Sequence, residues 1–143
     1  MSDSEHALLN PEELGPASGF SHVVQAATGC TLYLAGQVGC DATGTIVAGG
    51  IVNQLDMALG RVVTALAAAG GDPETVVALT LFTTEMAAYR AARAPIGTVY
   101  RAHFGRHYPA MTLVGVTDLA DPAAVIEISA IAVIPDATAD RAR

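Results

Sequence analysis

Hydrophobic side chains between residues 51 and 66 recur every three or four positions, the spacing that places them on one face of a helix. This pattern predicts an amphipathic helix that ends at the glycine pair 70–71, because glycine readily adopts the left-handed conformation that follows a helix. A second helix is predicted from Pro95, a residue suited to a first helical turn, to the apolar Phe104, and Gly105 should stop it. Each helix is expected to bury one apolar face.

Five other segments have the β-branched and aromatic content of strands. The first two are predicted to form a hairpin with Gly29 in its turn. Along the chain the order is two strands, helix, strand, helix and two strands, with no repeat of fixed period. This order predicts an α+β fold, a single sheet with two main helices packed on one face. The predicted strands span residues 20–27, 31–39, 76–84, 108–116 and 124–135.

The last predicted strand contains one carboxylate, Glu127, in an otherwise apolar run. Because successive strand side chains point to opposite faces, Glu127 falls with Ser129 on the face away from the helices, whereas Ile128 faces them. A buried carboxylate without partners is costly, so it either gains partners or its pKa rises. Two interpretations stay open: a catalytic base, or a structural carboxylate that accepts hydrogen bonds from backbone N–H groups or from Thr112 one strand across.

Apolar residues make up 52% of the 143-residue chain and charged residues only 15%. With so few surface charges, part of the apolar surface is expected to be covered by another copy of the chain. The apolar runs are shorter than the ~20 residues that span a bilayer, and the acidic start lacks a signal-peptide pattern. We therefore expect a cytoplasmic protein without membrane contact. We expect one domain over residues 15–135, a flexible arm over 1–14 and a disordered tail over 136–143.

The formal net charge is −7, and all seven basic residues are arginines. This charge argues against a nucleic-acid partner, which needs a basic face, and the absence of lysine excludes a lysine Schiff base. Cys30 and Cys40 are too few for a disulfide framework and are not spaced like a metal clip. His103 and His107 have a spacing that suits a metal on a helix, but Gly105 between them favours an incidental pair. We expect no metal and no cofactor.

Six motifs follow one another along the chain: GFSHVV, LAGQVG, VVALTLFTTEM, VYRAHF, YPAMTLVGV and IEISAIAVIP. In this order and spacing, over about residues 15 to 135, they resemble the RidA-like family of reactive-intermediate deaminases. The resemblance implies a chorismate-mutase-like fold, a homotrimer with a barrel-like centre and outer helices, and ligand clefts between subunits. It also implies a role for Glu127, because the family's glutamate is held to activate the water that hydrolyses an enamine or imine to a ketone and ammonia.

Four positions depart from the family's polar site. Met111 stands where the resemblance places the arginine that binds the substrate carboxylate, and methionine cannot make that bidentate contact. Phe20 replaces a tyrosine, Ala35 replaces the serine before Gly-Gln, and Gly97 lies near the position of an asparagine. Losing a buried contact to a carboxylate costs roughly 2–5 kcal/mol. Efficient turnover of small 2-imino acids is therefore not expected.

The sequence favours a RidA-like trimer whose intersubunit cleft hydrolyses an imine, enamine or related reactive intermediate other than a small 2-imino acid. The alternative is a trimer that binds a small molecule or a partner and has lost deaminase chemistry. Ribonuclease activity, sometimes attached to relatives, ranks last because the chain is acidic and lacks lysine. Glu127 is the catalytic candidate; for His22 a surface position is favoured over proton donation, and for Arg101 a solvated position over replacement of the missing arginine. The predicted substrate-binding residues are Phe20, His22, Ala35, Gly36, Met111, Thr112 and Leu113.

Overall fold

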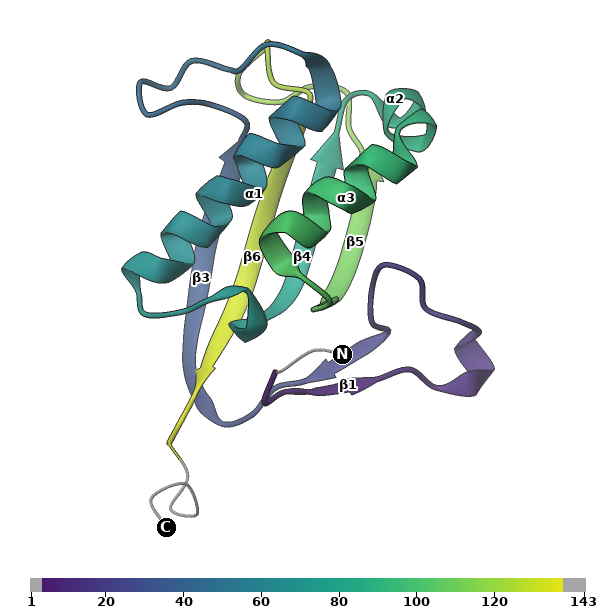
Figure 1. The fold of residues 1–143 in the computed structure, drawn as a ribbon, viewed down its shortest axis with the longest axis vertical. Coiled ribbons are helices and arrows are strands. Elements are labelled where there is room, and N and C mark those ends of the chain that lie inside the picture. The colour runs from purple at the N-terminus through teal and green to yellow at the C-terminus, as the bar shows by residue number, and fades with distance from the viewer. Residues whose placement is uncertain (1–3, 138–143) are drawn as a thin grey trace.

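The computed structural model describes residues 4–137, which form a four-stranded sheet with two long helices on one face (Figure 1). The strands of this sheet are β3 (Gly29–Val38), β4 (Val76–Thr83), β5 (Ala110–Gly115) and β6 (Ile126–Pro135), and the helices are α1 (Gly50–Ala68), α2 (Met86–Ala91) and α3 (Arg93–Phe104). The predicted α+β class, with α1 and α3 on a single face, is confirmed. The short helix α2 was not predicted, because it buries no side chain and so has no apolar face to read.

The strand order in the sheet is β3-β6-β4-β5. β6 is antiparallel to both of its neighbours, whereas β5 is parallel to β4, and α2 and α3 make the crossover that a parallel pair requires. The prediction that Thr112 of β5 lies one strand across from Glu127 of β6 is wrong, because β4 lies between these strands.

The predicted hairpin between residues 20–27 and 31–39 is not formed. Val23–Gln25 (β2) pairs instead with Ala7–Leu9 (β1) in a separate two-stranded sheet, and β3 pairs with β6. Gly29, expected in a turn, is the first residue of β3, and a Cβ there would lie 2.0 Å from the backbone oxygen of Ile134. This glycine thus allows two strands to approach closely and does not reverse the chain.

The core lies between α1 and the helix-facing side of the sheet, as the apolar periodicity predicts. Leu55, Leu59 and Val62 of α1 are each at most 2% exposed, and Ile126 and Ile128 of β6 are fully buried. α3 begins at Arg93, earlier than predicted. Pro95 fits there because the first N–H groups of a helix have no partner within it.

Part of the segment expected to be a flexible arm has regular structure: β1, followed by a 3₁₀ turn at Glu12–Leu14. His6 is only 5% exposed and joins this segment to the main sheet. Its Nδ1 accepts the Ala27 N–H at 3.0 Å, so its Nε2 donates to the Val133 carbonyl oxygen, also at 3.0 Å. Residues 1–3 of the predicted arm and residues 138–143 of the predicted tail lie outside the described residues.

The sheet face opposite the helices, called the open face below, carries exposed apolar side chains. Tyr33 is 80% exposed, Ile131 39% and Val114 36%. Glu127 lies half-buried on the same face, as the alternation of β6 predicts. Over residues 4–137, no helix has both the length and the apolar character needed to cross a membrane.

Candidate functional site

The carboxylate of Glu127 lies directly over Gly36 of β3. A Cβ on Gly36 would lie 2.1 Å from Oε1 of Glu127 and 2.8 Å from its carboxyl carbon, so any larger residue would displace the carboxylate. Within residues 4–137 the side chain of Glu127 makes no hydrogen bond and no ion pair. Thr112, the expected structural donor, instead pairs with Thr80 of β4. The carboxylate is therefore available to a bound molecule.

A β-bulge in β3 places Gly36 beneath that carboxylate. The strand register shifts between Leu34 and Gln37, so Ala35 and Gly36 together oppose Ser129 of β6. Bulges are common beside active sites, where the extra residue changes the direction of the chain. Ala35, Gly36 and Glu127 thus form one group on the open face.

A cavity of about 540 Å³ lies on the other side of the sheet, between β4, β5 and α3. Leucines from α1 and β4 form its floor, Met111 and Leu113 of β5 line one wall, and Tyr89 and Tyr100 line the helical wall. Phe20 closes it from the segment that precedes β2. The lining is mostly apolar, in agreement with the loss of polar residues read from the sequence.

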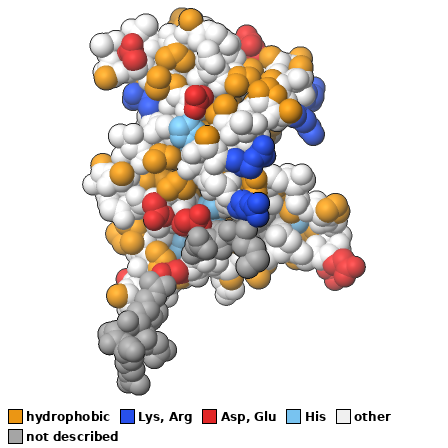
Figure 2. Space-filling view, in the orientation of Figure 1, with side chains coloured by type: hydrophobic (Ala, Val, Ile, Leu, Met, Phe, Trp, Pro, Cys, Tyr) orange, Lys and Arg blue, Asp and Glu red, His pale blue; other side chains and the backbone are white. Residues whose placement is uncertain are grey.

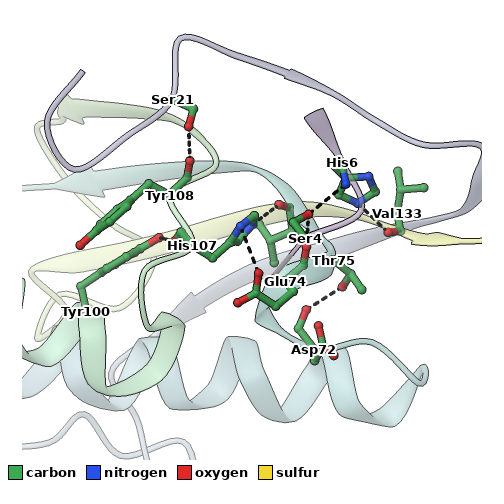
Figure 3. A network of polar contacts seen from close by, with 11 residues as sticks. Ser4, His6, Ser21, Asp72, Glu74, Thr75, Tyr100, His107, Tyr108 and Val133 are labelled. Atoms are coloured by element: carbon green, nitrogen blue, oxygen red, sulfur yellow. Dashed lines mark hydrogen bonds and ion pairs between the residues drawn. The ribbon is translucent and has the colours of Figure 1, made fainter. Parts of the chain in front are cut away.

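A smaller hollow of about 270 Å³ adjoins this cavity along the edge of β5. Phe20 and Met111 line both spaces, and His22 and Thr112 line only the smaller one. Ser21 holds the segment in place. Its N–H donates to the Pro109 carbonyl oxygen at 3.0 Å, and its hydroxyl donates to the Tyr108 carbonyl oxygen at 2.5 Å (Figure 3). Phe20, His22, Met111, Thr112 and Leu113 therefore gather around the edge strand.

The ring of His22 is held by local contacts. Its Nε2 lies 3.3 Å from the Gly15 carbonyl oxygen, and its edge packs against Phe20 with 5.0 Å between ring centroids. One ring nitrogen is thus occupied by the backbone.

One chain does not bring its two groups of predicted site residues together. Met111 pairs with Leu79, which pairs with Ala130, three residues along β6 from Glu127. Strand spacing and rise then place the Cα atoms of Met111 and Glu127 about 14 Å apart, and their side chains point to opposite faces.

Two arginines line the mouth of the larger cavity, and the sequence did not predict that they lie at the same site. Arg93 begins α3, and Arg101 follows two turns later on the same side of the cavity. A Cβ on Gly97 would lie 3.1 Å from Nη1 of Arg101, so Arg101 lies along the surface that Gly97 leaves free. Arg101 is solvent-exposed, as expected, and it also lines the mouth of the cavity. Its spacing of four residues from Gly97 could have indicated this position, because residues four apart are neighbours on a helix surface.

Buried hydrogen bonds fix the chain just before β5. His107 is fully buried; its Nε2 lies 2.8 Å from Val76 O and its Nδ1 3.6 Å from a Glu74 carboxylate oxygen. The Tyr100 hydroxyl donates to the His107 carbonyl oxygen at 2.6 Å (Figure 3). Burial raises the pKa of Tyr100, with smaller contributions from Tyr108 and Glu74, so this phenol remains a donor. The network positions the wall of the cavity.

His103 does not point toward His107: its Nε2 lies 2.6 Å from Oδ1 of Asp56 in α1. In the part of the chain that the structure describes, no three His, Cys, Asp or Glu residues are grouped as a metal site would need. Cys30 and Cys40 are free thiols, the first exposed and the second buried.

Comparison with known proteins gives one consistent result. The sequence profile of the family described as endoribonuclease L-PSP matches residues 11–134. Protein DfrA of Myxococcus xanthus is 34% identical over 129 residues, covering 90% of this chain and 92% of its own. The 2-iminobutanoate/2-iminopropanoate deaminase of Capra hircus is 36% identical over 104 residues, 72% of each chain. A crystal structure of YyfB, a conserved Rid family protein of Yersinia pestis, superposes with a TM-score of 0.82 at 33% identity, over 90% of this chain and 98% of its own.

The family match, residues 11–134, includes every residue of the two groups of site residues. The matches agree with the motifs quoted from the sequence, and the TM-score of 0.82 shows that the fold is shared. The chain therefore belongs to the Rid family, also called the YjgF or endoribonuclease L-PSP family.

Proposed function

We propose that this chain forms a homotrimer whose intersubunit clefts hydrolyse an imine, an enamine or a related reactive intermediate other than a small 2-imino acid. The observation that carries the proposal is the Glu127 carboxylate, held over Gly36 on the open face with no hydrogen-bond partner within residues 4–137. A half-buried carboxylate of this kind can orient a water molecule and accept its proton. Relatives named as deaminases support this chemistry.

The open face supports the assembly. A row of exposed apolar side chains that includes Tyr33 and Ile131 gains from burial against another copy of the chain. Three sheets that turn these faces inward form a barrel-like centre and leave α1 and α3 outside.

Assembly also supports a composite cleft. Glu127, Ala35 and Gly36 lie on the open face, whereas Phe20 and Met111 lie at the edge strand. An edge strand and an open face of one chain cannot face each other, but those of two adjacent chains can. In the proposed trimer, one subunit supplies Glu127 and its neighbour supplies the cavity.

In the proposed reaction the Glu127 carboxylate takes a proton from water while the water oxygen bonds to the imine carbon. The C=N π electrons move to nitrogen, which takes the proton from Glu127, and a carbinolamine forms. Glu127 then accepts the proton of the carbinolamine hydroxyl and transfers it to nitrogen, so the C=O π bond forms as the C–N bond breaks, and ammonia leaves a ketone behind. An enamine first takes a proton on carbon to become the imine. Backbone groups near Gly36 and Leu113 orient the reacting group.

The residues that line the cavity determine which class of substrate can bind. Met111 offers no charge to a carboxylate next to the reacting carbon, and Phe20 offers no hydroxyl. Small 2-imino acids therefore lack the contact that would hold them in this cleft, while an apolar substrate gains from the leucine-lined floor.

Nucleic acid is not proposed as a substrate, although the family description includes the word endoribonuclease. The chain carries fourteen acidic and seven basic residues, a balance that repels a phosphate backbone.

A coupled assay tests the proposed reaction. An amino-acid oxidase generates 2-imino acids in situ, neutral amide and ester analogues are run in parallel, and wild type is compared with Glu127→Gln and Met111→Arg. We expect wild type to be weak on the acids and active on an analogue, Glu127→Gln to lose that activity, and Met111→Arg to gain activity on the acids.

Each contrary result has a definite meaning. Equal activity of Glu127→Gln and wild type on every substrate would overturn the role of Glu127. Rapid hydrolysis of the small acids by wild type would overturn the substrate limit set by Met111. If all three proteins are inactive but a ligand raises their thermal stability, the alternative of a binding trimer without deaminase chemistry is correct.

A further inference from the structure

Within residues 4–137, most of the positively charged side chains lie on or next to the helices beside one cavity. Four of the five arginines within residues 4–137 lie in α2, in α3 or directly after α3. Figure 2 shows these side chains gathered on the side of the molecule that α2 and α3 form. Arg93 and Arg101 are the two that line the mouth of the 540 Å³ cavity.

Within residues 4–137, neither of these two guanidinium groups is neutralised by an acidic side chain. No Asp or Glu lines the cavity, and neither Arg93 nor Arg101 forms an ion pair within the described residues. Arg93 acts on Tyr89, whose pKa is raised by burial and lowered in part by this arginine. Tyr89 therefore stays a neutral phenol and adds a hydrogen-bond donor to the two cations.

We propose that Arg93 and Arg101 bind the carboxylate of an elongated organic anion whose apolar body fills the cavity between α3 and the sheet. The guanidinium fork matches a carboxylate in geometry and charge. The apolar body lies on the leucine floor and against aromatic rings, including those of Tyr100 and Tyr108, which stack on each other with 5.3 Å between centroids. The carboxylate is thus at one end of the bound anion, and the opposite end of the anion contacts β5 and Met111.

Gly97 leaves room for this arrangement on α3. A Cβ at this position would lie 3.1 Å from Nη1 of Arg101, so a side chain here would shift the guanidinium group by a few tenths of an ångström. Glycine is otherwise unfavourable inside a helix. Its presence one turn before Arg101 fits a position kept free for that side chain.

The proposal specifies the substrate class of the proposed cleft and to that extent rests on the proposed function, but anion binding can be measured without turnover. Isothermal titration with 4-phenylbutanoate, its neutral amide and acetate separates the contributions of charge and apolar body. We expect 4-phenylbutanoate to bind at least about tenfold more tightly than either of the other two, and its affinity to fall as salt increases.

Single-residue variants show which arginines bind the carboxylate. Arg101→Gln and Arg93→Gln should each weaken binding of 4-phenylbutanoate about tenfold or more, and Arg101→Lys should recover part of the loss. Arg90→Gln on α2 is the matched control, since Arg90 is also exposed but does not line the cavity, and it should bind as wild type. Arg93 and Arg101 are exposed, so their variants should keep the melting temperature of the unliganded protein.

The outcomes separate this inference from the proposed reaction. Equal binding of the acid and the amide, no binding of the acid, or unchanged binding in Arg101→Gln overturns the inference even if Glu127-dependent hydrolysis is found. Arginine-dependent binding in wild type and in Glu127→Gln supports the inference even if no imine is hydrolysed.

Discussion

Gly36 and Glu127 show how one missing side chain determines the position of a functional group. The carboxylate occupies the volume that a Cβ on Gly36 would fill, 2.1 Å from Oε1. Because the displaced atoms belong to the end of a flexible side chain, a larger residue at position 36 affects the direction of the carboxylate far more than the packing of the sheet.

Gly36→Ala should therefore separate activity from stability. The added methyl displaces the Glu127 carboxylate, and we expect turnover to fall at least about tenfold, since small misplacements of a catalytic group are costly. The free energy of unfolding should change by no more than about 1 kcal/mol, measured by urea denaturation. Gly115→Ala in β5 is the control, because a Cβ there meets nothing closer than 3.8 Å. Wild-type turnover in Gly36→Ala would show that the carboxylate position is irrelevant.

At the scale of elements, α3 combines two demands that oppose each other. Its apolar side chains Ile96, Tyr100 and Phe104 are buried against the core, which stabilises the helix. Gly97 weakens the helix but leaves room for Arg101. A position that costs stability without a packing reason is a sign of function.

Gly97→Ala should raise stability and weaken anion binding together. Replacing glycine by alanine inside a helix adds about 0.8–1 kcal/mol to the free energy of unfolding, while the new methyl moves the Arg101 guanidinium. Urea denaturation and titration with 4-phenylbutanoate measure the two effects. Gly60→Ala in α1 is the matched control: its Cβ would meet only His103 Cε1 at 3.5 Å, so stability should rise and binding stay constant. Unchanged binding in Gly97→Ala would remove the proposed role of that glycine.

The elements that could be predicted from the sequence are those whose buried apolar residues recur at a regular spacing. The spacing of Leu55, Leu59 and Val62 identified α1, and alternation identified the two faces of β6 and placed Glu127 correctly. Strand partners could not be predicted, because the choice of β6 over β2 as the neighbour of β3 depends on contacts between distant segments. For the same reason, the sequence led to a wrong position for Thr112 relative to Glu127. It also gave no sign that Arg93 and Arg101 line one cavity.

At the scale of the whole molecule, the proposed trimer explains why a single chain carries two half sites. Glu127 faces the open side of the sheet, and the cavity with Phe20 lies at the edge strand β5. Each subunit would contribute one half to each of two clefts. Variants in different halves should therefore complement one another when subunits are mixed.

Mixing Glu127→Gln with Phe20→Glu tests this arrangement. Each variant alone should form a trimer by light scattering and be inactive, the first for lack of a base and the second because a carboxylate enters the cavity mouth. After unfolding and refolding together in equal amounts, about a quarter of the clefts should combine an intact Glu127 half with an intact cavity half, and activity should recover to that fraction. Separately refolded samples that are then combined serve as the control. No recovery in the mixed trimer would mean that both halves of a cleft come from the same chain, and a monomeric wild type would exclude the assembly itself.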